Sequence, residues 1–357
     1  MADLVDWELA ERIAVRASGQ EPFADSYLAD SLEPDFAELT VLAEELVTEE
    51  TGLRSLAGPA TAAVTDRAGW VRANIASFQR ILGPVTDRFG KRVNGPSAVV
   101  MRSAAALEVG LLLGWMSGRV LGQYDLLVAA DDEPDEQDVV YYVGPNVLAI
   151  EKRFGFPPRE FRLWLALHEV THRAQFTGVP WMREHYLSLI DRMLSSADLD
   201  PLKLASALKR AVDEIRAGRS PLAEGGLAHL LATPEQRDVI DQIGGLMSLL
   251  EGHGDITMNR AGIGHVPSAD RFARVLQQRR TNANLVQRTI QRLLGLEAKL
   301  NQYQQGEAFI EEIERIGDGK SAIEPVWRGP TWLPTLSEIR EPQEWVDRVR
   351  LSEELVG

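Results

Sequence analysis

Apolar residues recur along most of the chain at the three- and four-residue spacing of amphipathic helices. This pattern predicts helices near residues 35–50, 66–89, 97–123, 159–175, 181–196, 201–217, 236–259 and 270–316. The helical period fails at 139–143, where the run Val-Val-Tyr-Tyr-Val predicts a strand, closed by the turn residues Gly144 and Pro145. The expected fold class is therefore mainly α with a small β-sheet.

The most apolar stretch, residues 109–122, is shorter than the roughly 20 residues that a membrane span needs. Four glycines, Gly110, Gly114, Gly118 and Gly122, recur in it at every fourth residue. Such a spacing leaves one helix face without side chains, so that another backbone can approach it closely. We expect a buried helix and no membrane span.

Composition adds expectations about folding, about nucleic-acid binding, and about metal ligands and location. The chain has 357 residues, of which 45% are hydrophobic and 25% charged, so most of it is expected to fold around a core. A net charge of -15 disfavours nucleic acid as a partner. The absence of cysteine excludes thiolate metal ligands and is typical of a reducing compartment; with no signal peptide visible at the start, the expected location is cytoplasmic.

Neither an internal repeat nor a low-complexity linker interrupts the sequence. The expected organisation is a single unit, 1–357, with sub-lobes 1–158 and 159–357. An acidic run at 131–138 lacks the spacing of a calcium loop and is expected to be a solvated surface loop. The tail at 317–342, rich in Pro and Gly, is expected to wrap around the fold in an ordered way and to carry Trp327 and Trp332. The sequence does not indicate an oligomeric state.

The candidate chemistry lies in the predicted helix at 159–175, which contains the motif His-Glu-x-x-His. Residues four apart share a helix face, so His168 and His172 can direct imidazole nitrogens at one zinc ion. Glu169 would then lie beside the open position of the metal, where a carboxylate can take a proton from water. The alternative is that these are two ordinary surface or core histidines.

A catalytic zinc site usually has a third protein ligand. Glu251 is the candidate, and Asp255, four residues later on the same predicted helix, is a candidate acceptor for the outer N–H of a ligating histidine. Between His172 and Glu251 lie 78 residues, which predicts an inserted helical pair. His253 is the rival third ligand, and ion pairing of Glu251 and Asp255 at a helix end is the structural alternative.

Several longer segments resemble a known family. HEVTHRAQF, LEGHGD, RLLGLEAKLNQY and VWRGPTWLP, with DWELAERIA and TDRAGWVRANIASFQRILGP nearer the start, are similar to bacterial zincin-like proteins of the Zincin-2 type, often labelled as associated with deazaflavin-coenzyme biosynthesis. The resemblance covers nearly the whole chain. It implies a zincin-like metallohydrolase with zinc on the HExxH helix, with His168, His172 and Glu251 as ligands and Glu169 as the catalytic residue. It also implies that the strand at 141–143 lies beside the metal helix and offers its edge to an extended substrate.

The group that would stabilise the oxyanion or contact the substrate has no motif. The candidates are residues that can donate a hydrogen bond: His253, Arg260, His265 and Tyr186. The segment 271–299 carries seven basic residues and one acidic residue, so it could receive a substrate carboxylate or phosphate, although pairing with the acidic surface is the simpler interpretation.

The expected function is a zinc-dependent hydrolase, a metallopeptidase that cleaves an amide bond in a peptide or a small amide. Two alternatives stay open: a catalytically idle zincin scaffold that acts as a binding protein, and a hydrolase of non-peptide amides or esters.

Overall fold

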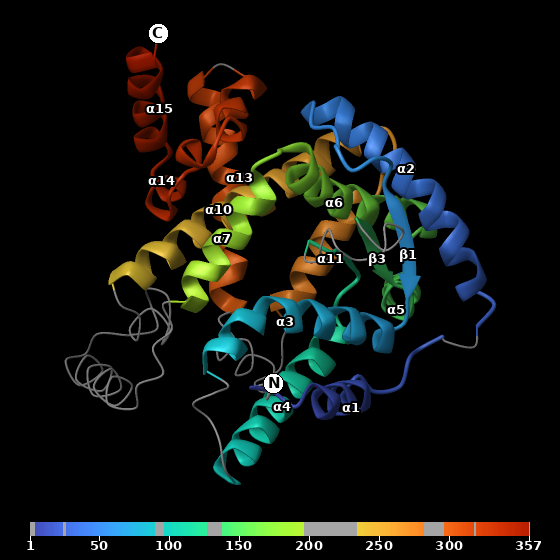
Figure 1. Cartoon of the computed structure of the whole chain (residues 1–357). Coiled ribbons are helices and arrows are strands. Elements are labelled where there is room, and N and C mark those ends of the chain that lie inside the picture. The colour runs from blue at the N-terminus through green and yellow to red at the C-terminus, as the bar shows by residue number, and fades with distance from the viewer. Residues whose placement is uncertain are drawn as a thin grey trace. The chain divides into compact units, whose positions relative to one another are not determined.

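The computed structural model describes residues 4–23, 26–89, 96–126, 138–195, 234–281, 296–317 and 319–356. Its elements, labelled in Figure 1, are α1 (Trp7–Ala17), η1 (Ala29–Ser31), α2 (Leu32–Thr51), β1 (Thr61–Thr65), α3 (Arg67–Phe89), α4 (Pro96–Ser117), β2 (Gly122–Tyr124), β3 (Val139–Val143), α5 (Gly144–Phe154), α6 (Pro158–Gly178), α7 (Met182–Ser195), α10 (Pro234–Ala261), α11 (Ala269–Thr281), α13 (Leu296–Gly317), η3 (Lys320–Trp327), η4 (Pro330–Trp332), α14 (Leu336–Arg340) and α15 (Pro342–Val356). The predicted fold class, mainly α with a small sheet, is confirmed.

The chain forms two units, each built from more than one stretch of sequence. The first contains residues 1–180 and 257–274, and the second contains 181–256 and 275–357. These boundaries differ from the predicted sub-lobe boundary between 158 and 159. The reason is that α6, expected to open the second sub-lobe, packs on α2 and on β2 in the first unit.

The sheet of the first unit has three strands in the order β1-β3-β2, with β1 parallel and β2 antiparallel to β3. Successive side chains of a strand point to opposite faces. Tyr142 therefore packs on α2, where its ring stacks on Phe36 at 3.8 Å and its hydroxyl lies 2.8 Å from the Thr40 hydroxyl. Val143 instead joins the apolar cluster of α1, α3 and α4.

The strand predicted at 139–143 is β3, but its expected role as an open substrate-pairing edge is wrong. Both of its edges are occupied, one by β1 and the other by β2. The sequence pattern did not reveal this because β1 and β2 are short and weakly apolar. Among the strands that the structure describes, β2 is the edge strand that lies against α6.

The glycine-rich helix is partly as predicted. A Cβ at Gly110 would lie 2.7 Å from the Ala10 carbonyl oxygen, and one at Gly114 would lie 2.6 Å from Ala17 Cβ, so α1 and α4 pack closely. The helix ends at Ser117, however, and it is not buried all round, because Leu107 and Leu111 are 49% and 51% exposed. By length and composition alone, its segment Val99–Ser117 could cross a membrane.

The second unit has its own core, made by α10, α13, η3, α14 and α15. Two helices cross at glycines: a Cβ at Gly306 of α13 would clash with the Ser248 carbonyl of α10, and a Cβ at Gly252 would clash with the backbone of Gly306. The ordered tail is confirmed, since Trp327 and Trp332 pack against this core. The predicted helix at 201–217 and most of the acidic run at 131–138 lie outside the described residues.

Candidate metal centre

The motif helix α6 begins where two prolines place it. Pro157 takes the extended N-cap position and Pro158 the first turn, where a missing N–H has no cost. Nearly every following side chain is buried, including Glu169, whereas His168 and His172 are only half-buried. The two histidines are therefore partly exposed on a helix that is otherwise almost entirely buried beyond residue 160.

The two imidazoles face each other through the same ring nitrogen. The Nε2 atoms of His168 and His172 lie 3.2 Å apart, and the rings are nearly perpendicular with centroids separated by 4.7 Å. Two nitrogens that bind one tetrahedral zinc at about 2.0–2.1 Å must lie about 3.3 Å from each other. The histidine pair therefore fits zinc without rearrangement of the nitrogens.

A residue that the motif does not include gives His172 the required tautomer. Its Nδ1 lies 3.0 Å from Oε1 of Gln175, a side chain with no exposed surface. The amide oxygen can only accept a hydrogen bond, so Nδ1 carries the proton and Nε2 keeps the lone pair that a metal requires. Sequence reasoning missed Gln175, although its position three residues after His172 on the same helix was a usable signal.

Glu169, the residue after His168 on α6, lies against strand β2. The backbone N–H of Tyr124 donates to its Oε2 at 3.2 Å. A Cβ on Gly122 would lie 2.8 Å from Glu169 Cγ, so the carboxylate fits only because residue 122 has no side chain. Gly122, which was predicted to serve helix packing, instead lies in strand β2 and makes a close contact with Glu169 of α6.

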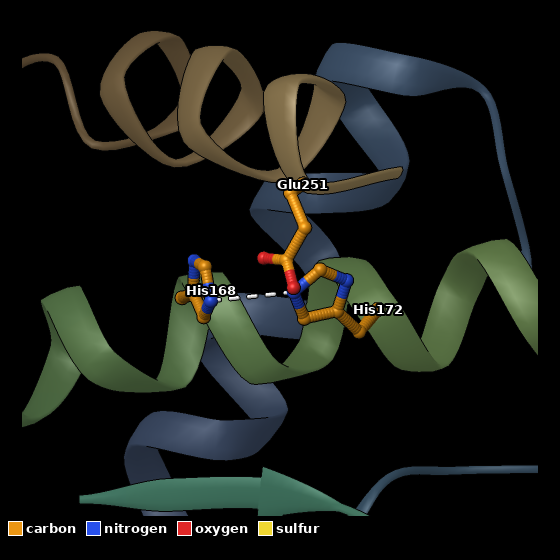
Figure 2. A group of neighbouring side chains, drawn as sticks. All are labelled: His168, His172 and Glu251. Atoms are coloured by element: carbon orange, nitrogen blue, oxygen red, sulfur yellow. Dashed lines mark hydrogen bonds between the residues drawn. The ribbon is translucent and has the colours of Figure 1, made fainter. Parts of the chain in front are cut away.

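His168, His172 and Glu251 form a group that could hold a metal ion (Figure 2). One ligand atom of each residue lies within 4.8 Å of those of the other two. Glu251 is buried on α10, and in Figure 2 its carboxylate points toward the imidazoles of α6. Two imidazoles and one carboxylate are a donor set of catalytic zinc sites.

The other predicted site residues lie in varied surroundings. His253 is buried in the second unit with its ring 5.0 Å from that of Trp327, and it is not in the metal-ligand group found among the described residues. His265 is exposed in the turn after α10, and Asp255 and Arg260 are half-buried. Their predicted roles stay predictions.

Tyr186 lies on α7 in the second unit. Burial raises the pKa of its hydroxyl, so the group keeps its proton and can donate a hydrogen bond, as an oxyanion contact must. Its assignment to the site stays a prediction.

One member of the basic segment 271–299 has a structural role. Arg271 donates to the carbonyl oxygens of Phe154 at 2.6 Å and Gly155 at 3.3 Å, and its guanidinium lies 5.3 Å from the Phe156 ring centroid. It is therefore engaged in fixing the start of α11 beside the end of α5. The side chains of most other basic residues in this segment lie outside the described residues.

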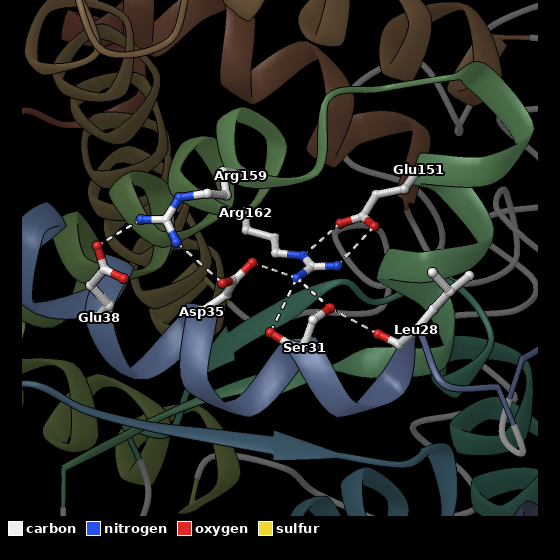
Figure 3. A network of polar contacts seen from close by, with 7 residues as sticks. All are labelled: Leu28, Ser31, Asp35, Glu38, Glu151, Arg159 and Arg162. Carbon is white, nitrogen blue, oxygen red and sulfur yellow. Dashed lines mark hydrogen bonds and ion pairs between the residues drawn. The ribbon is translucent and has the colours of Figure 1, made fainter.

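Two buried arginines anchor α6, and sequence reasoning found neither. Arg162 donates to both oxygens of Glu151, at 2.9 and 3.1 Å, to Asp35 at 2.6 Å and to Ser31 (Figure 3). These pairs join α6 to α2 through Asp35 and to α5 through Glu151. Asp35 also pairs with the exposed Arg159 of α6. The visible signal was an arginine on an otherwise apolar helix face.

Arg173 follows His172 directly and is almost fully buried. It donates to Glu44 of α2, to Asp138 just before β3 and to the carbonyl of Gly58. Asp138 ends the acidic run that was expected to be a solvated loop, and for this residue the expectation is wrong. An acid at the end of a loop is drawn inward because a buried guanidinium needs carboxylate partners.

Comparisons with known proteins agree with this geometry. The sequence model of a family described as zincin-like metallopeptidase matches residues 5–346. A crystal structure from Chloroflexus aurantiacus, titled as that of "a putative hydrolase with a novel fold", is similar over 97% of this chain and 99% of that chain, with 31% sequence identity and a TM-score of 0.70. No curated protein matches the chain. Together, the family and the structural neighbour support a hydrolase.

Proposed function

This chain belongs to the zincin-like metallopeptidase family, and from that premise we propose that it is a zinc-dependent metallopeptidase that cleaves an amide bond. The observation that carries the proposal is the pair of Nε2 atoms 3.2 Å apart on the HExxH helix, at the spacing that one tetrahedral zinc requires. Glu169 directly follows the first ligand, His168, which is the position of the water-activating glutamate in the HExxH motif.

In this proposal, His168, His172 and Glu251 hold the metal. Zinc, when bound, polarises the substrate carbonyl and lowers the pKa of a coordinated water. Gln175 keeps the proton of His172 on Nδ1, so that Nε2 is available as a ligand. Asp255 is proposed to accept the outer N–H of a ligating histidine in the same way.

Glu169 performs the proton transfers. It accepts the proton of the attacking water and delivers it to the leaving amine. The developing negative charge on the carbonyl oxygen needs a hydrogen-bond donor, for which His253, Arg260, His265 and Tyr186 are the proposed candidates.

The proposed substrate is a peptide or a small amide, acted on in the cytoplasm. The net charge of -15 disfavours nucleic acid in that role. The link to deazaflavin-coenzyme biosynthesis stays a prediction from the resemblance.

The replacement of Glu169 by Gln tests the proposal, because it preserves the volume of the side chain but removes the proton acceptor. We expect hydrolysis of a quenched-fluorescence peptide library to fall by about 10²- to 10⁴-fold. Zinc content, measured in parallel by atomic absorption, should stay the same, since Glu169 is not a metal ligand. The control is Glu353→Gln, an exposed glutamate of α15.

Equal cleavage rates for the unmodified protein and Glu169→Gln would refute the mechanism. A protein that binds zinc and cleaves no peptide would instead support the alternatives, an idle scaffold or a hydrolase of non-peptide amides or esters. Those two are separated by offering small amides and esters to the same preparation.

A further inference from the structure

Strand β2 has one paired edge and one outward edge. Residues 121, 123 and 125 make the ladder to β3: Val143 N–H donates to the Leu121 carbonyl at 2.9 Å and Asp125 N–H to the Val139 carbonyl at 3.3 Å, while Gln123 lies opposite Tyr141. Backbone groups alternate in direction along an antiparallel strand. Those of Gly122 and Tyr124 therefore point away from β3.

The outward edge meets Glu169. The Tyr124 N–H donates to Oε2 at 3.2 Å, and a Cβ on Gly122 would lie 2.8 Å from both Cγ and Oε1. Contacts of a Cβ below 3.0 Å are essentially never seen, so a side chain at 122 would displace the glutamate or the strand. The buried carboxylate is thus enclosed by the backbone of two residues about 45 positions earlier in the chain.

The strand itself is fixed on three sides. Beyond its ladder to β3, Gln123 accepts a 2.7 Å hydrogen bond from the indole N–H of Trp70 on α3. The ring of Tyr124 stacks with that of Phe176 at 6.5 Å, on the same helix as Glu169. A carboxylate that is bound to a strand held in this way keeps one orientation.

We propose that β2 is the positioning element of the catalytic base: the missing side chain of Gly122 gives Glu169 its place, and the Tyr124 N–H orients its carboxylate. This inference rests on the proposed function. Its consequence for catalysis is geometric, because misplacing a reacting group by about 1 Å can cost about 10²-fold in rate.

The first test replaces Gly122 by Ala. The expected result is a 10- to 100-fold fall in kcat on any peptide that the unmodified protein cleaves, with KM within about twofold and zinc content unchanged. The control is Gly118→Ala, four residues earlier, where a Cβ would be 3.8 Å from its nearest neighbour, the Arg67 guanidinium carbon. An unchanged kcat for Gly122→Ala would overturn the proposal.

The second test separates the hydrogen bond from the packing. Tyr124→Pro removes the N–H, and Tyr124→Ala keeps it while removing the ring. Proline is tolerated on an edge strand where the N–H points outward. We expect Tyr124→Pro to lower kcat at least tenfold below Tyr124→Ala; equal values would refute the role of the N–H.

A third measurement does not need a substrate. Gly122→Ala should lower the unfolding midpoint in the presence of Glu169 and much less in Glu169→Ala, where the clashing atoms are absent. If Gly122→Ala lowers the unfolding midpoint equally with and without Glu169→Ala, the positioning role is overturned, even if the protein is an active hydrolase. A coupled effect in a protein that cleaves nothing would uphold the contact and refute only the proposed function.

Discussion

At the scale of single residues, the candidate centre depends on how its two imidazoles are supported. Gln175 supports His172 through the hydrogen bond at Nδ1, and its side chain is fully buried. Partners of this kind orient a ligand ring and fix its tautomer, and their loss typically weakens metal binding about 10- to 100-fold.

We therefore expect Gln175→Met to weaken zinc binding by about that factor, because methionine has a similar shape but cannot accept a strong hydrogen bond. The measurement is a competition titration with a chromophoric chelator. Gln343→Met, at an exposed glutamine of α15, should leave the affinity unchanged. If the two variants bind zinc equally well, Gln175 is a packing residue only.

Whether these residues could be predicted depends on whether the residues that they contact are close to them in sequence. His168, Glu169 and His172 could be predicted because one helical turn brings them together, and Gln175 could have been found by the same spacing. Gly122 and Tyr124 could not, because their relation to Glu169 depends on the pairing of β2 with β3. The assignments of Glu251 and Asp255 as ligand and support stay predictions.

At the scale of elements, α6 is anchored by charge as well as by apolar contacts. Arg162 and Arg173 each bring two carboxylates to a buried guanidinium. Removal of one partner from such a group leaves uncompensated charges, which is more damaging than the absence of the whole group. The arginines thereby hold the motif helix in register with α2.

Two arginines three residues apart on α6 offer a matched comparison. We expect Arg162→Met to lower the free energy of unfolding by about 3–5 kcal/mol, since Glu151 and Asp35 then lose the cation that they share. Arg159→Met, which breaks only exposed pairs, should cost about 0–1 kcal/mol. Urea unfolding followed by circular dichroism measures both, and similar values for the two variants would contradict this account.

The long helices could be predicted from periodicity because each buries one apolar stripe. The ends and the short elements could not. The helix expected at 97–123 ends at Ser117, and the residues after it form β2, because Gly122 is used at a strand edge. Residues 144–154 form α5 because Pro145 opens a helix as readily as it closes a strand.

At the scale of the whole molecule, metal binding and stability are linked. A ligand that binds only the folded chain stabilises it by about 2.7 kcal/mol at a free concentration 100-fold above its Kd. Between the proposed ligands His172 and Glu251 lie 78 residues, so the unfolded chain has no preformed site.

We expect zinc to raise the urea midpoint of the unmodified protein and a chelator to lower it again. His172→Ala should abolish both responses, because the remaining residues offer too few ligands for tight binding. Circular dichroism at several free zinc concentrations gives the size of the effect. The same zinc response in His172→Ala would place the metal elsewhere on the protein.

The first unit is built from two separate stretches of the chain, and this constrains how it can fold during synthesis on the ribosome. Phe272 is fully buried, with its ring 4.6 Å from that of Phe156 and 5.3 Å from that of Phe161. This aromatic centre cannot close until residue 272 has left the exit tunnel, and by then all of 181–256 has been translated. Domains usually fold from the N-terminus as they emerge. Here Phe156 and Phe161 must wait for their partner Phe272, which lies in a segment translated after a large part of the second unit.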